Sequence, residues 1–369
     1  MTKPHFHFDH VGSYLRPQEL KTAREDFAAG KISREELQAV QDKLVKELVD
    51  HEVENGLQVV SDGEFGRSWW HLDFLWQLIG LESYLQEDSY KFHGAKTRTT
   101  NVRIVGKLAE NPNHSFYRDF TYLKSITPEG VTPKVTIPSP TLLFRDNRSD
   151  FALDFYETWQ DYLDGLAQTY HDTIQHFYDL GARYVQLDDT TWAFLIQQLR
   201  ESKNDAAEQA KYIKLAQDAV YLINKSLENL PEDLTLATHI CRGNFQSTYL
   251  FEGGYGDISS YLGQLNYDNF FLEYDDSRSG DFSPLAAIWN NRPNVELILG
   301  VITSKKPKLE DVDAVIARIQ EAAQSVPLEN LGISTQCGFA STEEGNILTE
   351  QDEWNKLQLI KSITDKVWG

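Results

Sequence analysis

Short apolar runs alternate with longer segments of helical periodicity along the whole chain. The apolar runs are rich in β-branched and aromatic residues, as expected for buried strands. We predict eight strands, at residues 8–13, 57–64, 133–139, 184–189, 234–241, 269–274, 296–302 and 331–337. Eight strands that alternate with helices are typical of a parallel sheet. The predicted fold class is therefore α/β, a (β/α)8 TIM barrel, with a doubly wound open sheet as the alternative.

The clearest helix begins after Ser33. Ser33 and Glu36 have the spacing of a capping box, and apolar residues keep helical spacing until Gly56, which suits a C-cap. Similar periodicity predicts further helices, near residues 206–227, 312–323 and 350–367. Helices of this length between short strands agree with the predicted barrel.

Residues 83–126 depart from this alternation. Polar and β-branched residues alternate there, so we predict a β-hairpin insertion after the second strand unit. The chain has no internal repeat and no linker-like segment. We therefore expect one (β/α)8 domain over residues 1–369, with the insertion inside it.

The composition is ordinary for a soluble globular protein, with 41% hydrophobic and 25% charged residues. Asp and Glu number 56 against 35 Lys and Arg, and a formal charge of -21 would repel a phosphate backbone, so we expect no nucleic-acid partner. Two Cys are too few for a disulfide framework and fit a reducing compartment. Without a membrane-spanning run or a signal peptide, the chain is expected to be cytoplasmic, with no membrane partner.

Side chains with metal-binding and catalytic chemistry gather at the predicted strand ends. His239 and Cys241 are two residues apart on one strand, so their side chains face the same side, and this N/S pair suits zinc. In such barrels the C-terminal strand ends share one mouth, where function collects. The residues expected at that mouth are Ser13, Glu64, Asp188, Asp189, His239, Cys241, Glu273 and Cys337.

These residues and their neighbours resemble cobalamin-independent methionine synthases, in particular the catalytic C-terminal half and the stand-alone proteins built from it. The resemblance covers nearly the whole chain and is carried by His10-Val11-Gly12-Ser13, Asp62-Gly63-Glu64, Gln186-Leu187-Asp188-Asp189, His239-Ile240-Cys241, Glu273 and Gln336-Cys337-Gly338. It implies zinc held by His239, Cys241, Glu273 and Cys337. It also implies that Ser13, Glu64 and Asp188, with the backbone near Gly12, bind the amino-acid part of homocysteine.

The implied activity is that of a methyltransferase, which moves a methyl group to the homocysteine thiol and forms methionine. Two thiolates, a carboxylate and an imidazole give a zinc site a net negative charge, so the site activates water poorly but keeps a bound thiol nucleophilic. The partners are then homocysteine and a methyl donor. The donor is 5-methyltetrahydrofolate or its polyglutamate, or another compound such as a methylcorrinoid, a thioether or a sulfonium.

One departure from the family concerns the proton donor for the leaving group. The family has a His just after the seventh strand, where this chain continues Thr303-Ser304-Lys305-Lys306. No catalytic acid is therefore assigned. Lys305, Lys306 and Lys308 either bind an anionic tail or are solvated surface residues.

Two other functions stay open. One is zinc-dependent alkyl transfer to another small thiol, which the amino-acid site at Glu64 and Asp188 disfavours. The other is a non-catalytic zinc-binding barrel. The remaining aromatic and His residues are interpreted as packing, although stacking of the Trp side chains on a flat donor is the alternative: Trp69, Trp70, Trp192, His71, His171 and His176.

Overall fold

A computed structural model describes residues 3, 5–89, 91–92 and 95–369. Its centre is a six-stranded parallel sheet with the strand order β12-β11-β10-β9-β8-β7. These strands are β7 (Val135–Pro138), β8 (Tyr184–Asp189), β9 (Thr235–Ile240), β10 (Asn269–Glu273), β11 (Glu296–Ile302) and β12 (Leu331–Thr335). Every residue in them is buried, as expected for strands covered on both faces.

Shorter segments close the sheet into a barrel. On one side, β1 (Val59–Val60) pairs in parallel with β6 (Thr132–Pro133), which continues into β7. On the other side, Phe8 forms a parallel bridge with Ile333 of β12. The first segment also reaches the loop after β1, because the Tyr14 N–H donates to the Gly63 carbonyl at 3.1 Å. The predicted (β/α)8 barrel is confirmed, and the open sheet is excluded.

The first two predicted strands are much shorter than the sequence indicates. Residues 8–13 contribute a single bridge, and residues 57–64 contribute the two residues of β1. The cause is backbone geometry, since Gly12, Gly63 and Glu64 have φ of 138°, 62° and 60°, values that a strand does not allow. The chain therefore leaves the ring early and places Glu64 in a loop at the mouth.

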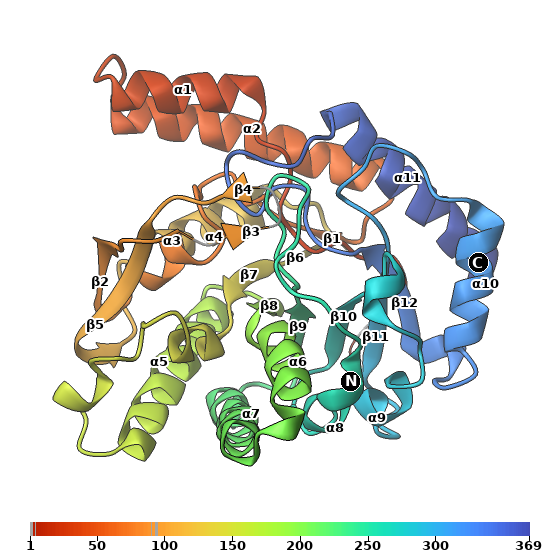
Figure 1. The fold of residues 1–369 in the computed structure, drawn as a ribbon. Helices are drawn as coiled ribbons and strands as arrows, with labels where there is room; N and C mark the ends of the chain where they lie inside the picture. Colours follow the sequence, from red (N-terminus) through yellow and green to blue (C-terminus); the bar gives the residue numbers. More distant parts are fainter. Residues whose placement is uncertain (1–2, 4, 90, 93–94) are drawn as a thin grey trace.

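Helices surround the ring of strands, and the α1–α2 pair projects beyond it (Figure 1). The α-helices are α1 (Gln18–Ala28), α2 (Arg34–Glu54), α3 (Leu72–Leu75), α4 (Ser115–Ile126), α5 (Trp159–Asp179), α6 (Thr191–Glu201), α7 (Ala206–Leu227), α8 (Ser259–Leu262), α9 (Leu285–Trp289), α10 (Val312–Ala322) and α11 (Glu350–Val367). Short 3-10 turns are η1 (Pro140–Phe144), η2 (Ala152–Asp154), η3 (Ser202–Asn204), η4 (Tyr255–Asp257), η5 (Ser277–Ser279) and η6 (Leu328–Asn330). Among the described helices, none combines the length and apolar character needed to cross a membrane.

The predicted insertion is only partly β structure. β2 (Ile79–Leu85) pairs antiparallel with β5 (Thr100–Ala109), and the short β3 (Lys91–Phe92) and β4 (Ala95–Lys96) pair between them. The end of the predicted range is the helix α4 instead. Its buried apolar residues repeat at helical spacing, a signal that the alternation reading overlooked: Phe116, Tyr117, Phe120 and Leu123.

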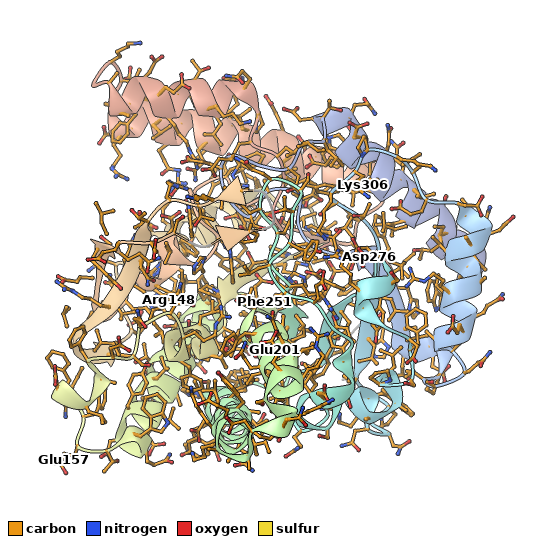
Figure 2. The ribbon with its side chains drawn as sticks, viewed as in Figure 1. Arg148, Glu157, Glu201, Phe251, Asp276 and Lys306 are labelled. Carbon is orange, nitrogen blue, oxygen red and sulfur yellow. The ribbon has the colours of Figure 1, made fainter. Side chains whose placement is uncertain are left out.

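Side chains fill the space inside the ring, so the barrel is a packed core and not a pore (Figure 2). Alternate strand residues point inward and form one cluster: Phe6, Val11, Val59, Tyr184, Ala237, Phe271 and Ile298. One ion pair lies among them. Lys134 Nζ is 2.9 Å from Asp9 Oδ1, and both side chains are fully buried.

Replacing Ser33 with alanine is expected to lower the free energy of unfolding by about 1 kcal/mol. Ser33 Oγ accepts from the Glu36 N–H at 3.1 Å, and the Glu36 carboxylate accepts from the Ser33 N–H at 2.7 Å, so the predicted capping box is confirmed. Urea unfolding of Ser33→Ala beside Gln38→Ala, a control inside the same helix, measures the effect. Equal midpoints for the two variants would show that the cap contributes nothing.

Candidate metal and substrate site

Four side chains with metal-binding atoms meet at the C-terminal end of the strands. His239 and Cys241 come from the end of β9, Glu273 is the last residue of β10, and Cys337 follows β12. One donor atom from each residue lies within 4.8 Å of the others, and all four residues are buried. The fold therefore brings together the four residues that the sequence predicts as ligands.

The strand between β10 and β12 makes room for the fourth predicted ligand. β11 lies between β10 and β12 and supplies no member of the cluster. Its Gly300 sits under the chain after β12, because a Cβ at Gly300 would lie only 2.6 Å from Gln336 Cα. A larger residue would push that chain outward. Gly300 thus allows Cys337 to reach across β11 to Cys241.

The spacing of the two sulfur atoms fits a shared metal ion. Cys241 Sγ and Cys337 Sγ are 3.8 Å apart, and both cysteines are free. Two sulfur ligands of one tetrahedral zinc, each at about 2.3 Å, would be separated by about 3.8 Å. The sulfur–sulfur distance and the mixed N, O and S donor set therefore both suit zinc.

The contact between the two thiols moves their pKa values in opposite directions. The hydrogen bond from Cys241 lowers the pKa of Cys337, while burial opposes that change. The same contact, together with burial, raises the pKa of Cys241. A second thiolate at this buried position requires a neighbouring cation, which a divalent metal supplies.

His239 is oriented by a carboxylate. Its Nδ1 lies 3.3 Å from Asp188 Oδ1, and its Nε2 lies 3.8 Å from Glu273 Oε1. Burial opposes the charged imidazole, but the Asp188 carboxylate and the Cys337 thiolate outweigh it and raise the pKa of His239 to about 9. Carboxylates in this position are the usual partners of metal-binding His. Asp188, predicted as a substrate contact, therefore also orients His239.

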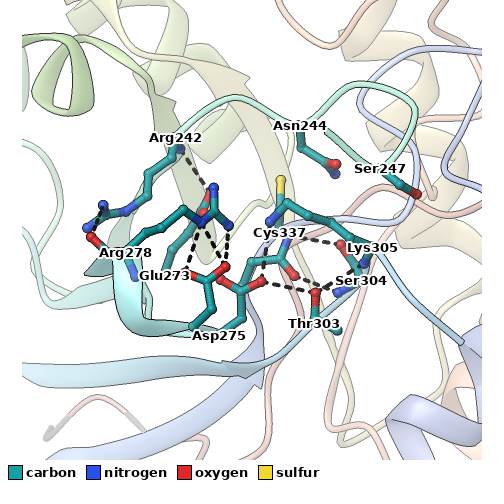
Figure 3. A network of polar contacts seen from close by, with 12 residues as sticks. Arg242, Asn244, Ser247, Glu273, Asp275, Arg278, Thr303, Ser304, Lys305 and Cys337 are labelled. Carbon is teal, nitrogen blue, oxygen red and sulfur yellow. Dashed lines mark hydrogen bonds and ion pairs between the residues drawn. The ribbon is translucent and has the colours of Figure 1, made fainter. Parts of the chain in front are cut away.

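Charged residues surround Glu273 on its other side (Figure 3). The Arg242 N–H donates to Glu273 Oε1 at 3.0 Å. Burial raises the pKa of Glu273, and the nearby Lys305 charge opposes that rise. Lys305 Nζ lies 3.4 Å from Asp275 Oδ2, which also accepts from Thr303 Oγ1 at 3.0 Å. The Arg242 N–H thus holds the Glu273 carboxylate in place, and Lys305 is a positive charge near it.

Lys305 is a buried cation, so the expectation of a solvated side chain is wrong for this residue. Burial favours its neutral form, but Glu273 and Asp275 outweigh it and raise its pKa. Lys306 and Lys308 are exposed, as one of the two alternatives expects. Sequence reasoning missed Lys305 as a buried charge beside the four predicted ligands. Its position directly after β11 was the available signal.

A pocket adjoins the four donors and brings three predicted substrate residues to them. Ser13, Glu64 and Asp188 share its lining with His239, Cys241 and Cys337. Gly12 does not line it, and its carbonyl accepts from Ser61 Oγ at 2.8 Å. Asp189 is also turned away, since it accepts from Thr141 Oγ1 at 2.7 Å. The pocket therefore places acidic side chains beside the sulfur atoms.

Glu64 has one carboxylate oxygen without a partner. Glu64 Oε1 accepts from Thr136 Oγ1 at 3.0 Å and lies 3.2 Å from Arg67 Nη1. Glu64 Oε2 is buried and has no hydrogen-bond partner among the described residues. Burial is also the main cause that raises the pKa of this carboxyl. A buried, unpartnered carboxylate oxygen in a pocket suits a substrate cation.

Ser13 packs closely against the loop that follows β12. A Cβ at Gly338 would lie 1.9 Å from Ser13 Oγ, so a larger residue there would have to displace the Ser13 side chain. The Ala340 N–H donates to Ser13 Oγ at 3.4 Å. The hydroxyl is therefore fixed at the pocket wall next to Cys337.

Several residues of the site were missed or misread in the sequence. Arg67 is buried beside Glu64, and the acidic Glu64 three residues earlier was its only signal. His71, interpreted as structural, lines a second pocket with Trp69 and Trp70. Trp192 is fully buried in the core, as the packing interpretation expects.

Comparison with known proteins agrees with this geometry. The family profile described as "Cobalamin-independent synthase, Catalytic domain" matches residues 7–352. The uncharacterized protein YxjH of Bacillus subtilis is 42% identical over 99% of this chain and 96% of its own length. The methionine synthase of Sulfolobus acidocaldarius is 23% identical over 89% of this chain and 84% of its own length. A Listeria monocytogenes crystal structure superposes with a TM-score of 0.78 at 34% identity, covering 100% of this chain and 99% of that one.

Proposed function

Because this chain belongs to the cobalamin-independent methionine synthase family, we propose that it transfers a methyl group to the thiol of homocysteine and forms methionine. One observation carries the proposal. The sulfur atoms of Cys241 and Cys337 form one wall of a pocket whose other walls hold Glu64 and Asp188. A small molecule with a thiol at one end and an ammonium at the other suits such a pocket.

Zinc is the metal that the donor set fits best. His239, Cys241, Glu273 and Cys337 would hold it, since thiolate, imidazole and carboxylate are all ligands of zinc in proteins. When bound, zinc would keep the substrate thiol deprotonated and nucleophilic at neutral pH. Asp188 orients the His239 ring, and the Arg242 N–H orients Glu273.

The residues of the pocket position the amino acid. The unpartnered Glu64 Oε2 and the Asp188 carboxylate attract the ammonium group. Ser13 Oγ is a hydrogen-bond donor for the carboxylate. Fixing both charged groups turns the methyl transfer into an effectively intramolecular step.

The candidate methyl donors differ in charge, and some are uncharged or anionic while others are cationic. The candidates are 5-methyltetrahydrofolate, its polyglutamate, a methylcorrinoid, a thioether and a sulfonium. Lys305 occupies the loop after β11, where the family carries a His. A Lys whose pKa is raised stays protonated and contributes a fixed charge.

Zinc-edge X-ray absorption tests the proposal directly. The zinc content of the protein is determined first, and the absorption spectrum is then recorded with and without homocysteine. We expect one zinc per chain that gains a sulfur neighbour when homocysteine is added. Zinc whose surroundings stay the same after the thiol is added would contradict the proposed function.

Replacing Glu64 with glutamine is expected to weaken homocysteine binding about 30-fold, because a buried charge partner of the ammonium is lost. Binding of 4-mercaptobutyrate, which is homocysteine without its amino group, is expected to change little. Calorimetric titration of both thiols measures the difference. Glu82→Gln, an exposed carboxyl paired with Arg103, is the matched control. Equal loss for both thiols would mean that Glu64 maintains the pocket and does not bind the amino group.

A further inference from the structure

A single hydroxyl group joins the two loops that carry Ser13 and Glu64. Ser61 follows β1 directly, and its Oγ donates to the Gly12 carbonyl at 2.8 Å. The same oxygen accepts from the Gly63 N–H at 3.2 Å. Gly12 directly precedes Ser13, and Gly63 directly precedes Glu64. Ser61 therefore connects the backbone of the two residues that lead into the proposed substrate contacts.

The backbone itself provides little connection between these loops. In the part of the chain that the structure describes, β1 pairs with β6, and one backbone hydrogen bond, from the Tyr14 N–H to the Gly63 carbonyl at 3.1 Å, joins residues 8–14 to residues 57–64. Gly12 and Gly63 have positive φ and lie outside any strand. Buried backbone groups need partners, so Ser61 supplies the contacts that a neighbouring strand supplies elsewhere in the barrel.

His10 also contacts the Ser61 hydroxyl. Its Nε2 lies 3.1 Å from Ser61 Oγ. A serine hydroxyl has one hydrogen, and the Gly12 carbonyl, which only accepts, receives it. Ser61 Oγ must therefore accept from His10, so the imidazole carries a hydrogen on Nε2. This contact fixes the orientation of the hydroxyl, and with it the hydrogen bond to Gly12.

Glu52 contacts both His10 and Ser61. Its Oε1 lies 3.0 Å from His10 Nε2, and its two oxygens accept from the Ser61 N–H at 3.3 and 3.2 Å. Glu52 lies on the buried face of α2, four residues after Leu48, and its side chain is fully buried. A carboxylate at such an apolar position costs free energy unless its oxygens are hydrogen-bonded, and His10 and Ser61 supply these bonds.

Glu, His and Ser are also the residue types of a nucleophilic triad, but this arrangement differs from one. In a triad the carboxylate and the hydroxyl contact opposite nitrogens of the imidazole. Here Glu52 and Ser61 both contact Nε2 of His10, and Nδ1 faces Asp9 Oδ1 at 3.4 Å. Ser61 is 1% exposed and does not line the substrate pocket. Its hydroxyl thus acts on the protein backbone and not on a substrate.

We infer that Ser61 is a positioning residue, held in turn by His10 and Glu52. It fixes the separation between Ser13 and Glu64, and it thereby selects thiols that carry an ammonium and a carboxylate on the same carbon. This inference rests on the proposed function. A substrate with both charged groups binds tightly only when both partners stand at the right separation. A thiol with one of the two groups needs one partner, so its affinity does not depend on that separation.

Calorimetric titration of the zinc-loaded protein with three thiols tests the inference. Homocysteine carries both charged groups, 4-mercaptobutyrate lacks the ammonium, and 3-mercaptopropylamine lacks the carboxylate. Ser61→Ala is expected to weaken homocysteine binding about tenfold, because the Gly12 carbonyl and the Gly63 N–H lose their shared partner. The affinities for the two thiols with a single charged group are expected to change little.

Two variants of His10 test the same contact from its other end. Asparagine is too short to reach Ser61, so His10→Asn is expected to weaken homocysteine binding about threefold through loss of one hydrogen bond. The amide nitrogen of glutamine can take the place of Nε2, so His10→Gln is expected to restore most of the affinity. Ser226→Ala is the matched control, since Ser226 is buried on α7 and donates to the Leu222 carbonyl away from the pocket.

The pattern across the three thiols separates the outcomes, and urea unfolding of each variant shows whether it is folded. A loss restricted to homocysteine in Ser61→Ala and His10→Asn, with recovery in His10→Gln, supports the inference. Equal losses for all three thiols, or wild-type affinity for homocysteine in both variants, overturn it and leave the proposed function standing. If Ser61→Ala does not fold, the two His10 variants decide between the same outcomes. Wild-type protein that does not bind homocysteine overturns both the inference and the proposed function.

Discussion

Replacing Cys337 with serine is expected to remove zinc and to reduce methyl transfer more than 100-fold, since losing a ligand costs more than the 10–100-fold typical of an outer contact. Cys337 Sγ lies 3.8 Å from Cys241 Sγ, and both cysteines are free and buried. Serine is a poor ligand for zinc at neutral pH. Metal analysis after dialysis against a chelator measures the loss without relying on activity.

Ser341→Ala is the control for this experiment. Ser341 Oγ lies 3.8 Å from Cys337 Sγ but belongs to no ligand set, so this variant is expected to keep its zinc. A Cys337→Ser protein with full zinc content would show that Cys337 is not a ligand. Loss of zinc in both variants would point to a general disturbance of the loop after β12.

Replacing Lys134 with methionine is expected to lower the free energy of unfolding by about 3–5 kcal/mol, because it leaves the Asp9 charge buried without its cation. Lys134 Nζ and Asp9 Oδ1 are 2.9 Å apart inside the barrel, and Asp9 Oδ2 accepts from Tyr184. Burial raises the pKa of Asp9, but Lys134 and His10 outweigh it and keep the group ionised. Urea unfolding measures the effect.

A double variant distinguishes this mechanism from simple loss of packing. Lys134→Met combined with Asp9→Asn is expected to cost less than the sum of the single changes, because the stranded charge is absent. Lys361→Met, which removes a surface pair with Asp365, is the control and is expected to change stability by less than about 0.5 kcal/mol. Additive costs in the double variant would rule out the proposed coupling.

Most of the fold follows from local patterns. β8 to β12 were predicted because continuous apolar runs are typical of strands buried on both faces. α6 was missed, although its buried Trp192, Leu195 and Ile196 keep helical spacing after the polar residues that end β8. The short first strands also escaped prediction, because the φ of 60° at Glu64 is set by its surroundings and not by its own residue type.

Some features of the candidate site could likewise be predicted from the sequence, and others could not. Strand ends of a barrel converge, so the meeting of His239 and Cys241 with Cys337 was predictable from position. The role of Glu273 as a ligand came from the family resemblance. Contacts that depend on side-chain rotamers and loop paths were not accessible, such as Asp188 against His239, Lys305 against Asp275 and Arg148 against His71.

The backbone hydrogen bonds between neighbouring strands are unevenly distributed around the barrel, and this affects how the barrel moves. β7 to β12 are joined by hydrogen-bonded ladders, whereas the arc between β12 and β6 is closed by the bridge at Phe8, the Tyr14–Gly63 hydrogen bond and the two residues of β1. Local opening requires the least free energy where the fewest backbone hydrogen bonds must break. Ser13 and Glu64 both stand on that arc. We therefore expect the strands that carry His239, Cys241 and Glu273 to stay fixed. The arc that carries Ser13 and Glu64, the residues proposed to bind the amino acid, is expected to open locally at a lower free energy.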